Sequence, residues 1–142
     1  MKTSELYQKT KILILGLIAT FTIISFTSCN KEIPFQKSAV IPAAEGAVKV
    51  KQDKNKNYAI QVHVTNLAGA DRLSPPKSFY VVWMKSEMNE PRRLGRLNSS
   101  NKLKASFETV SQIKPYMIFI TAEDNDDVQE PGDLIVLTTG NF

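Results

Sequence analysis

Few side chains in this 142-residue sequence have the type and spacing that catalysis or metal binding requires. His63 is the only histidine, and its neighbours on the same face of the predicted strand are Gln61 and Thr65. A zinc site needs three or four converging ligands, and an activated serine needs a base that a third group orients. No Gly-x-Ser-x-Gly motif occurs. We therefore expect no enzyme activity and no cofactor, and we expect His63 to be a solvated residue of a sheet.

The highest local charge is acidic and lies in residues 123–127, Glu-Asp-Asn-Asp-Asp. Asp124, Asp126 and Asp127 suggest calcium binding, because carboxylates are hard oxygen ligands. The spacing departs from an EF-hand loop, since Val128 stands where an oxygen donor is needed and no glycine follows it. We expect a solvated hairpin loop that attracts cations only weakly through these three aspartates, and no specific metal site.

The most basic stretch of the predicted domain is Pro91-Arg92-Arg93 together with Arg96. These arginines could form a basic edge for acidic lipid or polysaccharide. Edge strands also commonly carry charge, which prevents pairing with the sheets of other molecules. We favour this protective interpretation.

Cys29 is the only cysteine and directly follows a segment that is typical of a secretion signal. Three lysines within the first eleven residues precede an apolar run at 12–26. That run of about 15 residues is shorter than the roughly 20 that a membrane-spanning helix needs. It ends in Phe26-Thr27-Ser28-Cys29, which resembles the lipobox of bacterial lipoproteins, with phenylalanine in place of the usual leucine.

The lipobox resemblance implies that residues 1–28 are a signal peptide and that lipid, including palmitate, is attached to Cys29. An uncleaved transmembrane anchor and ordinary signal cleavage are the alternatives, and all three export the domain. We therefore expect a lipid-anchored protein of the cell envelope, at the outer membrane or the periplasmic face of the inner membrane. The lipid would be its contact with the membrane.

Removal of the signal would take three lysines and one glutamate with it, leaving 15 basic and 13 acidic residues. The whole-chain isoelectric point of about 9.2 is thus partly a property of the signal. A mature charge of about +2, without a patch of interleaved basic and aromatic residues, does not favour nucleic acid as a partner.

Residues 29–44 contain two prolines and little apolar periodicity, which predicts an extended tether after the lipidated cysteine. From residue 45 to 142, short β-branched and aromatic runs alternate with turn residues. The expected strands are Ala47–Gln52, Tyr58–Asn66, Ser78–Met84, Arg92–Leu97, Leu103–Val110, Met117–Glu123 and Leu134–Thr138. About seven strands in about 100 residues predict an all-β, immunoglobulin-like antiparallel β-sandwich.

Two of these expected strands also indicate which of their side chains are buried. In the second, Tyr58, Ile60, Val62 and Val64 alternate with more polar residues, which predicts one buried face. The third, Phe-Tyr-Val-Val-Trp-Met, has no polar interruption and predicts a central strand that is buried on both sides, with Trp83 in the core of the sandwich.

The domain also resembles the carboxy-terminal domain of anti-sigma-K factors over about Val48 to Thr139. The segments that carry the resemblance are 80–84 (Tyr-Val-Val-Trp-Met), Leu94-Gly95, 119–123 (Phe-Ile-Thr-Ala-Glu) and 132–137 (Gly-Asp-Leu-Ile-Val-Leu). The resemblance implies an extracytoplasmic β-sandwich. That family captures the sigma factor with a separate cytoplasmic domain, which this sequence lacks, and its glycine-rich loop is replaced here by an acidic one.

These features together predict a non-catalytic, membrane-anchored envelope lipoprotein that acts as an interaction or sensing module for an unidentified envelope protein or glycan. The alternative is a module that binds carbohydrate or another surface ligand. Exposed aromatic residues in a loop or groove would favour the alternative.

Overall fold

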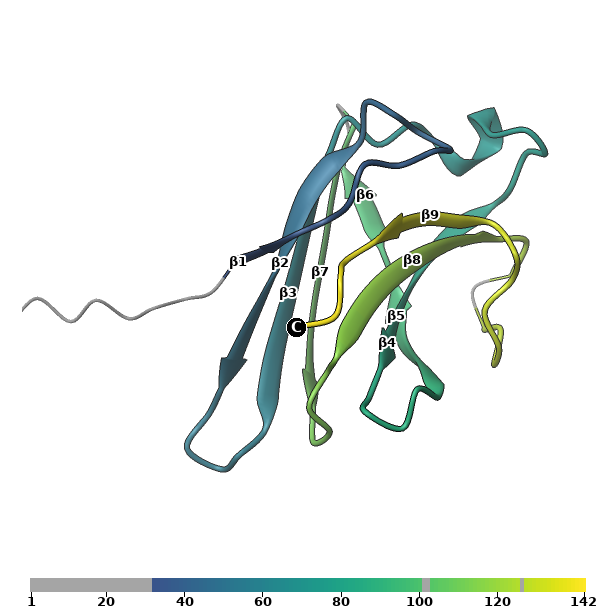
Figure 1. Ribbon diagram of the computed structural model, residues 1–142. Coiled ribbons are helices and arrows are strands. Elements are labelled where there is room, and N and C mark those ends of the chain that lie inside the picture. The colour runs from purple at the N-terminus through teal and green to yellow at the C-terminus, as the bar shows by residue number, and fades with distance from the viewer. Residues whose placement is uncertain (1–31, 101–102, 126) are drawn as a thin grey trace, which may run out of the picture.

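Two antiparallel sheets face each other in the computed structural model, which describes residues 32–100, 103–125 and 127–142 (Figure 1). The first sheet has the order β1-β2-β3-β7-β6 and the second β5-β4-β8-β9. The strands are β1 (Glu32–Pro34), β2 (Glu45–Gln52), β3 (Tyr58–Thr65), β4 (Phe79–Lys85), β5 (Pro91–Arg96), β6 (Asn98–Ser100), β7 (Lys104–Ser111), β8 (Met117–Glu123) and β9 (Ile135–Thr138). A short 3₁₀ helix, η1 (Ala70–Arg72), lies between β3 and β4.

The strand order confirms the all-β sandwich. If β2, β3 and β4 are taken as strands A, B and C, the two sheets contain the orders A-B-E-D and C-F-G of the immunoglobulin arrangement, and β1 and β5 are two added edge strands. All seven expected strands are present with bounds that differ by at most two residues. The sequence pattern missed β1 and β6, because a three-residue strand leaves no periodic signal.

The expected faces of the two informative strands are also confirmed. Ile60, Val62 and Val64 are buried in β3, whereas the residues between them are exposed. The five central residues of β4 are all buried, as its uninterrupted apolar sequence predicts. β4 lies between β5 and β8, so both of its edges are paired.

The main core fills the space between the two sheets. Its fully buried large side chains include Val48, Ile60, Val62, Val82, Met84, Ile118, Ile120 and Leu137. Alternate residues of each strand point to it, and the remaining residues point away from it. This alternation decides which residues of β4 and β8 lie on the outer face of their sheet.

The segment predicted to be a tether is instead part of the domain from residue 32 onward. β1 pairs with β2, placing Ile33 opposite Val48, and Ile33 is only 8% exposed. Ile41 and Ser38 are buried as well, and the Ser38 hydroxyl donates a hydrogen bond to the Val136 carbonyl. The tether interpretation is therefore wrong for this part, because scattered apolar residues in a segment without periodicity can still fill gaps in a core.

This segment also connects the two sheets on one side of the sandwich. The Gln36 N–H donates a hydrogen bond of 2.8 Å to the Thr138 carbonyl, and Phe35 forms an isolated bridge with Thr139. On the other side, the chain passes from β5 to β6 through the single buried residue Leu97.

Candidate functional site

Trp83 is fully buried, but not between the sheets where the sequence placed it. Together with Val81 and Phe119, it forms a second apolar cluster on the outer face of the β5-β4-β8-β9 sheet. The rings of Trp83 and Phe119 are stacked with centroids 6.3 Å apart. Val128, from the β8–β9 loop, packs against this cluster. The expectation of a tryptophan in the central core is thus corrected, because the loop provides a second, smaller core.

A chain of hydrogen bonds holds this loop on the sheet. The Trp83 indole N–H donates to the Thr121 hydroxyl at 2.8 Å, and that hydroxyl donates to the Glu123 carboxylate at 2.5 Å. The same carboxylate oxygen accepts the Gly132 N–H at 2.8 Å. A Cβ at residue 132 would lie only 2.7 Å from the other Glu123 oxygen, so a larger residue there would displace the carboxylate. Glu123, at 6% exposure, is therefore a buried clamp for the loop.

The acidic loop accordingly differs from the expected solvated hairpin. Its first carboxylate, Glu123, is buried, whereas Asp124 and Asp127 are exposed and Asp126 lies outside the described residues. Asp124 forms an ion pair of 2.8 Å with Lys77. Within the described ranges, no three histidine, cysteine or acidic side chains are grouped closely enough to hold a metal ion. Weak cation attraction by these aspartates remains a prediction.

Two long loops meet at one end of the sandwich. The β3–β4 loop spans residues 66–78 and the β8–β9 loop spans 124–134. They correspond to the B–C and F–G loops, which carry antigen-binding residues in variable domains. The Ser78 N–H donates to the Glu123 carbonyl at 2.9 Å and joins the two loops at their bases. The opposite end has only short turns between β2 and β3, β4 and β5, and β7 and β8.

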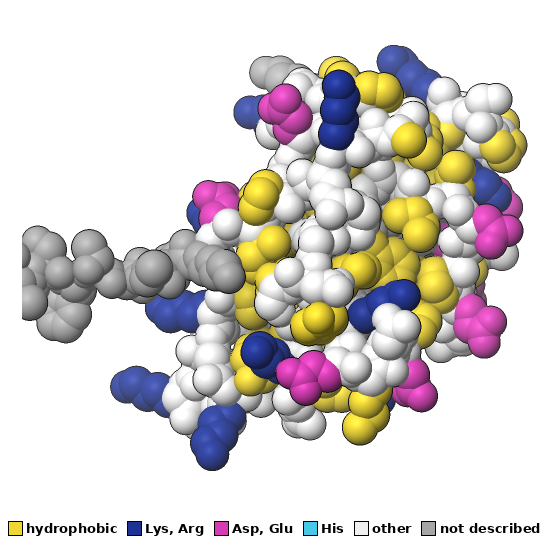
Figure 2. Space-filling view, in the orientation of Figure 1, with side chains coloured by type: hydrophobic (Ala, Val, Ile, Leu, Met, Phe, Trp, Pro, Cys, Tyr) yellow, Lys and Arg dark blue, Asp and Glu magenta, His cyan; other side chains and the backbone are white. Residues whose placement is uncertain are grey.

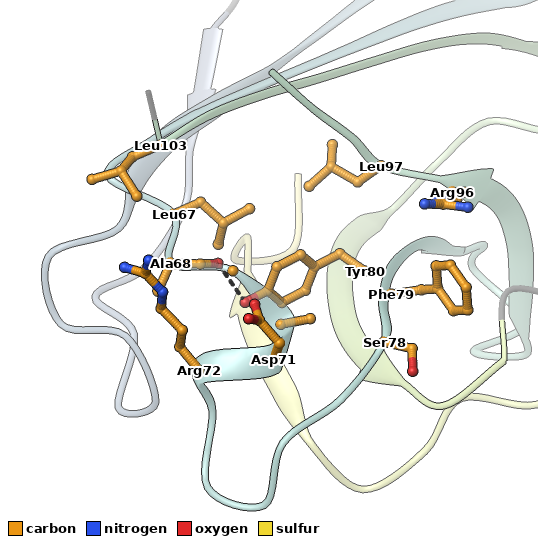
Figure 3. Close-up of a pocket in the computed structure, with 12 residues that line it drawn as sticks. Leu67, Ala68, Asp71, Arg72, Ser78, Phe79, Tyr80, Arg96, Leu97 and Leu103 are labelled. Atoms are coloured by element: carbon orange, nitrogen blue, oxygen red, sulfur yellow. Dashed lines mark hydrogen bonds between the residues drawn. The ribbon is translucent and has the colours of Figure 1, made fainter. Parts of the chain in front are cut away.

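The β3–β4 loop forms one side of a cavity of about 260 Å³, which we call the η1 pocket (Figure 3). Asp71 and Arg72 come from η1, Phe79 and Tyr80 from the start of β4, and Arg96 from the end of β5. Leu67, Ala68, Gly69, Ala70, Ser78, Leu97 and Leu103 complete its lining. Charged, aromatic and aliphatic groups thus converge in one concave site at the end of the sandwich.

Tyr80 connects the pocket to the framework. Its hydroxyl donates a hydrogen bond of 2.8 Å to the Ala68 carbonyl, drawn as a dashed line in Figure 3. Burial of the phenol and the nearby charge of Asp71 raise the pKa of Tyr80 to about 12. The phenol therefore stays protonated at neutral pH and keeps the β3–β4 loop attached to β4.

The arginines of β5 lie on an edge strand, as their protective interpretation requires. Arg93 is paired in register with Trp83, next to a β-bulge. The Arg96 guanidinium lies 4.2 Å from the centroid of the Phe79 ring and so covers one face of that aromatic residue. Arg92 is exposed.

His63 is exposed on the outer face of the first sheet, as expected. Its partners in register are Ala47 on β2 and Ser106 on β7, neither of which is acidic. The structure does not bring it to either long loop.

Cys29 and the predicted signal peptide lie outside the described residues. Among the residues that are described, no helix is long and apolar enough to cross a membrane. Comparisons with protein-family models, with curated proteins and with solved structures found no significant match.

Sequence reasoning missed Asp71, Arg72 and Tyr80 as candidate site residues. One signal was present, because a connection of about a dozen residues inside a small sandwich is longer than most and such loops are commonly functional. The sequence does not show that this loop lies beside β4 and Arg96, because that proximity depends on how β4 pairs with β5.

Proposed function

We propose that the protein is a non-catalytic, lipid-anchored envelope protein that binds another envelope molecule through its loop end. The η1 pocket is the observation that carries the binding part of this proposal. It offers an acid, two basic groups and two aromatic rings on a rigid sheet framework, and binding residues are often found on loops that such a scaffold positions.

The sequence before β1 supports the anchor. Cys29 follows the apolar run directly and lies three residues before Glu32, the first residue of β1. The resemblance to the extracytoplasmic domain of anti-sigma-K factors supports the same compartment. The proposal is an interaction or sensing role without direct sigma-factor binding.

The anchor is tested with labelled palmitate in cells that make the full chain. Wild-type protein should incorporate the label, and Cys29→Ala should not, because no other thiol can accept the lipid. Cys29→Ala should also accumulate with its signal attached. Label in the mutant protein would contradict the lipobox interpretation.

The pocket is tested by replacing Asp71 and Arg72 together with alanine and identifying partners by cross-linking in intact cells. Both side chains are exposed, so the fold should be retained. A matched control replaces Glu90 and Lys114, an exposed acid and an exposed base in two turns at the opposite end of the sandwich. A specific partner should be lost only with the pocket variant. Equal recovery of that partner with both variants would exclude the η1 pocket as its binding site.

A carbohydrate ligand is the second candidate. The proximity of the half-buried Phe79 to Asp71 and Arg72 favours it, because an aromatic ring and charged groups are suited to the face and hydroxyls of a sugar. Binding to a glycan array that is abolished by the Asp71 and Arg72 replacements would select this candidate over a protein partner.

A further inference from the structure

The lipid proposed on Cys29 would hold the sandwich very close to the membrane. Only Asn30 and Lys31 separate Cys29 from Glu32, where β1 begins. An extended chain advances at most about 3.6 Å per residue, so the Cα atoms of Cys29 and Glu32 are within about 11 Å of each other. The proposed anchor therefore restricts which surface can face the lipid.

The register of β1 points to one particular surface. Glu32 lies opposite Lys49, and β2 continues from Lys49 through Lys51 into the β2–β3 turn. The amino-terminal end of β1 is therefore directed toward that turn.

Four lysines lie in eight residues on this side of the domain: Lys49, Lys51, Lys54 and Lys56. The last three are exposed, and Lys49 forms a long ion pair of 3.7 Å with Glu32. We call Lys51, Lys54 and Lys56 the hairpin lysines. Figure 2 shows basic side chains along the lower left margin, beside the point where the chain enters the domain and over the β2–β3 hairpin.

The only acid within the turn of this hairpin, residues 53–57, has its carboxylate occupied by hydrogen bonds of the turn itself. Asp53 accepts hydrogen bonds of 2.8 Å from the N–H groups of Asn55 and Asn57, and its other oxygen accepts the Asn57 side-chain amide. These bonds also lower the pKa of Asp53, the Asn57 backbone bond most strongly. The carboxylate thus shapes the turn, while the three lysines project into solvent.

We propose that the β2–β3 hairpin is a membrane-facing surface whose lysines contact anionic lipid head groups beside the anchor. This inference rests on the proposed lipidation of Cys29. Each lysine near an anionic surface strengthens attraction about fivefold, and the attraction falls within a Debye length. The orientation would leave η1 and the β8–β9 loop facing away from the membrane, since Figure 1 shows both on the side opposite the chain entry.

Amine labelling of the processed protein tests this orientation. The protein is reconstituted in phosphatidylcholine vesicles that contain phosphatidylglycerol, and in nonionic detergent, and labelled lysines are quantified by mass spectrometry. The hairpin lysines should react several-fold more slowly in vesicles. Lys77 and Lys104, which lie in the β3–β4 loop and at the start of β7, at the opposite end of the sandwich, should react equally in both.

A second measurement isolates the effect of charge. A dye on Asn55→Cys, at the tip of the turn, should be quenched by nitroxide-headgroup lipid in the same vesicles. Replacing the three hairpin lysines with glutamine should reduce quenching to its value in pure phosphatidylcholine. Replacing Arg72, Lys77 and Lys104 with glutamine removes the same charge from the opposite end of the sandwich and should leave quenching unchanged.

Palmitate incorporation is measured first in every preparation. Absence of lipid would overturn both the anchor and this orientation. Lipidated protein with uniform lysine labelling, or with equal quenching in neutral and anionic vesicles, would overturn only the orientation.

Discussion

The indole nitrogen of Trp83 and the hydroxyl of Thr121 are 2.8 Å apart, and neither residue is accessible to solvent. They lie on neighbouring strands, β4 and β8, on the sheet face that points away from the main core. Because Thr121 also donates to Glu123, this contact links the second apolar cluster to the loop that covers it. The first two predictions follow from this link.

Trp83→Ala should lower the free energy of unfolding by about 3 to 5 kcal/mol, the usual cost of deleting a large buried aromatic side chain. Thr121→Val should cost about 1 to 3 kcal/mol, since it leaves the indole N–H and Glu123 without that partner. Urea unfolding measures both changes. Val110→Ala, at a residue that is 64% exposed, is the control and should change stability by at most about 0.5 kcal/mol. A loss below about 1 kcal/mol for Trp83→Ala would contradict the burial of the indole.

Glu123→Ala should release the β8–β9 loop, because the Gly132 N–H and the Thr121 hydroxyl lose their common acceptor. Hydrogen exchange and limited proteolysis of residues 128–134 should become faster. Glu123→Gln should restore part of the protection, since its amide oxygen can still accept. Glu130→Ala, at an exposed residue of the same loop, should have little effect. Equal exchange in all three variants would show that Glu123 does not hold the loop.

A chain that begins at Ala44 should be much less stable than one that begins at Asn30. The shorter chain loses the burial of Ile33 and Ile41, each worth about 1.5 to 3 kcal/mol, and the Ser38 hydrogen bond. Thermal unfolding followed by circular dichroism compares the two. Ile33→Ala in the longer chain should reproduce part of the loss, whereas Pro34→Ala, at an exposed position, should not. Identical melting of the two chains would mean that residues 32–43 contribute nothing.

Tyr80 should make stability depend on alkaline pH. Its pKa is about 12 in the folded protein and about 10 when unfolded, so the folded state binds the proton more tightly. The stability that the protonated Tyr80 contributes is fully present below a pH of about 10 and is lost as the pH rises through about 12. Ultraviolet titration should resolve one late-ionising tyrosine, and Tyr80→Phe should remove that signal and flatten the stability curve between those values. A titration without a late tyrosine would contradict the buried phenol.

Calcium should not stabilise the domain appreciably. Specific calcium sites need roughly six to eight oxygens at fixed distances, whereas Asp124 is already paired with Lys77 and Asp127 is exposed. Replacing Asp124, Asp126 and Asp127 with serine should leave the melting temperature nearly unchanged, with or without calcium. A calcium-dependent rise of several degrees that disappears in the triple variant would establish a metal site.

The sequence by itself determined the strands and their inward faces. Apolar alternation in β3 and the continuous apolar run of β4 predicted the burial of both strands, because side chains alternate across a strand whatever its partners are. The prediction of an anchor also comes from the sequence alone, since a signal segment and the cysteine that follows it are recognised from consecutive residues.

Only the tertiary structure decided what covers each face. Val82 and Trp83 are neighbours on β4 and point to opposite faces of the sheet, and only the folding of the β8–β9 loop over the outer face gives Trp83 a cluster of its own. Local sequence patterns do not predict contacts between distant residues, such as the hydrogen bond between Ser38 and Val136, which are 98 residues apart. The η1 pocket has the same origin, because Asp71, Tyr80 and Arg96 come together only when two sheets pair and a loop closes over their end.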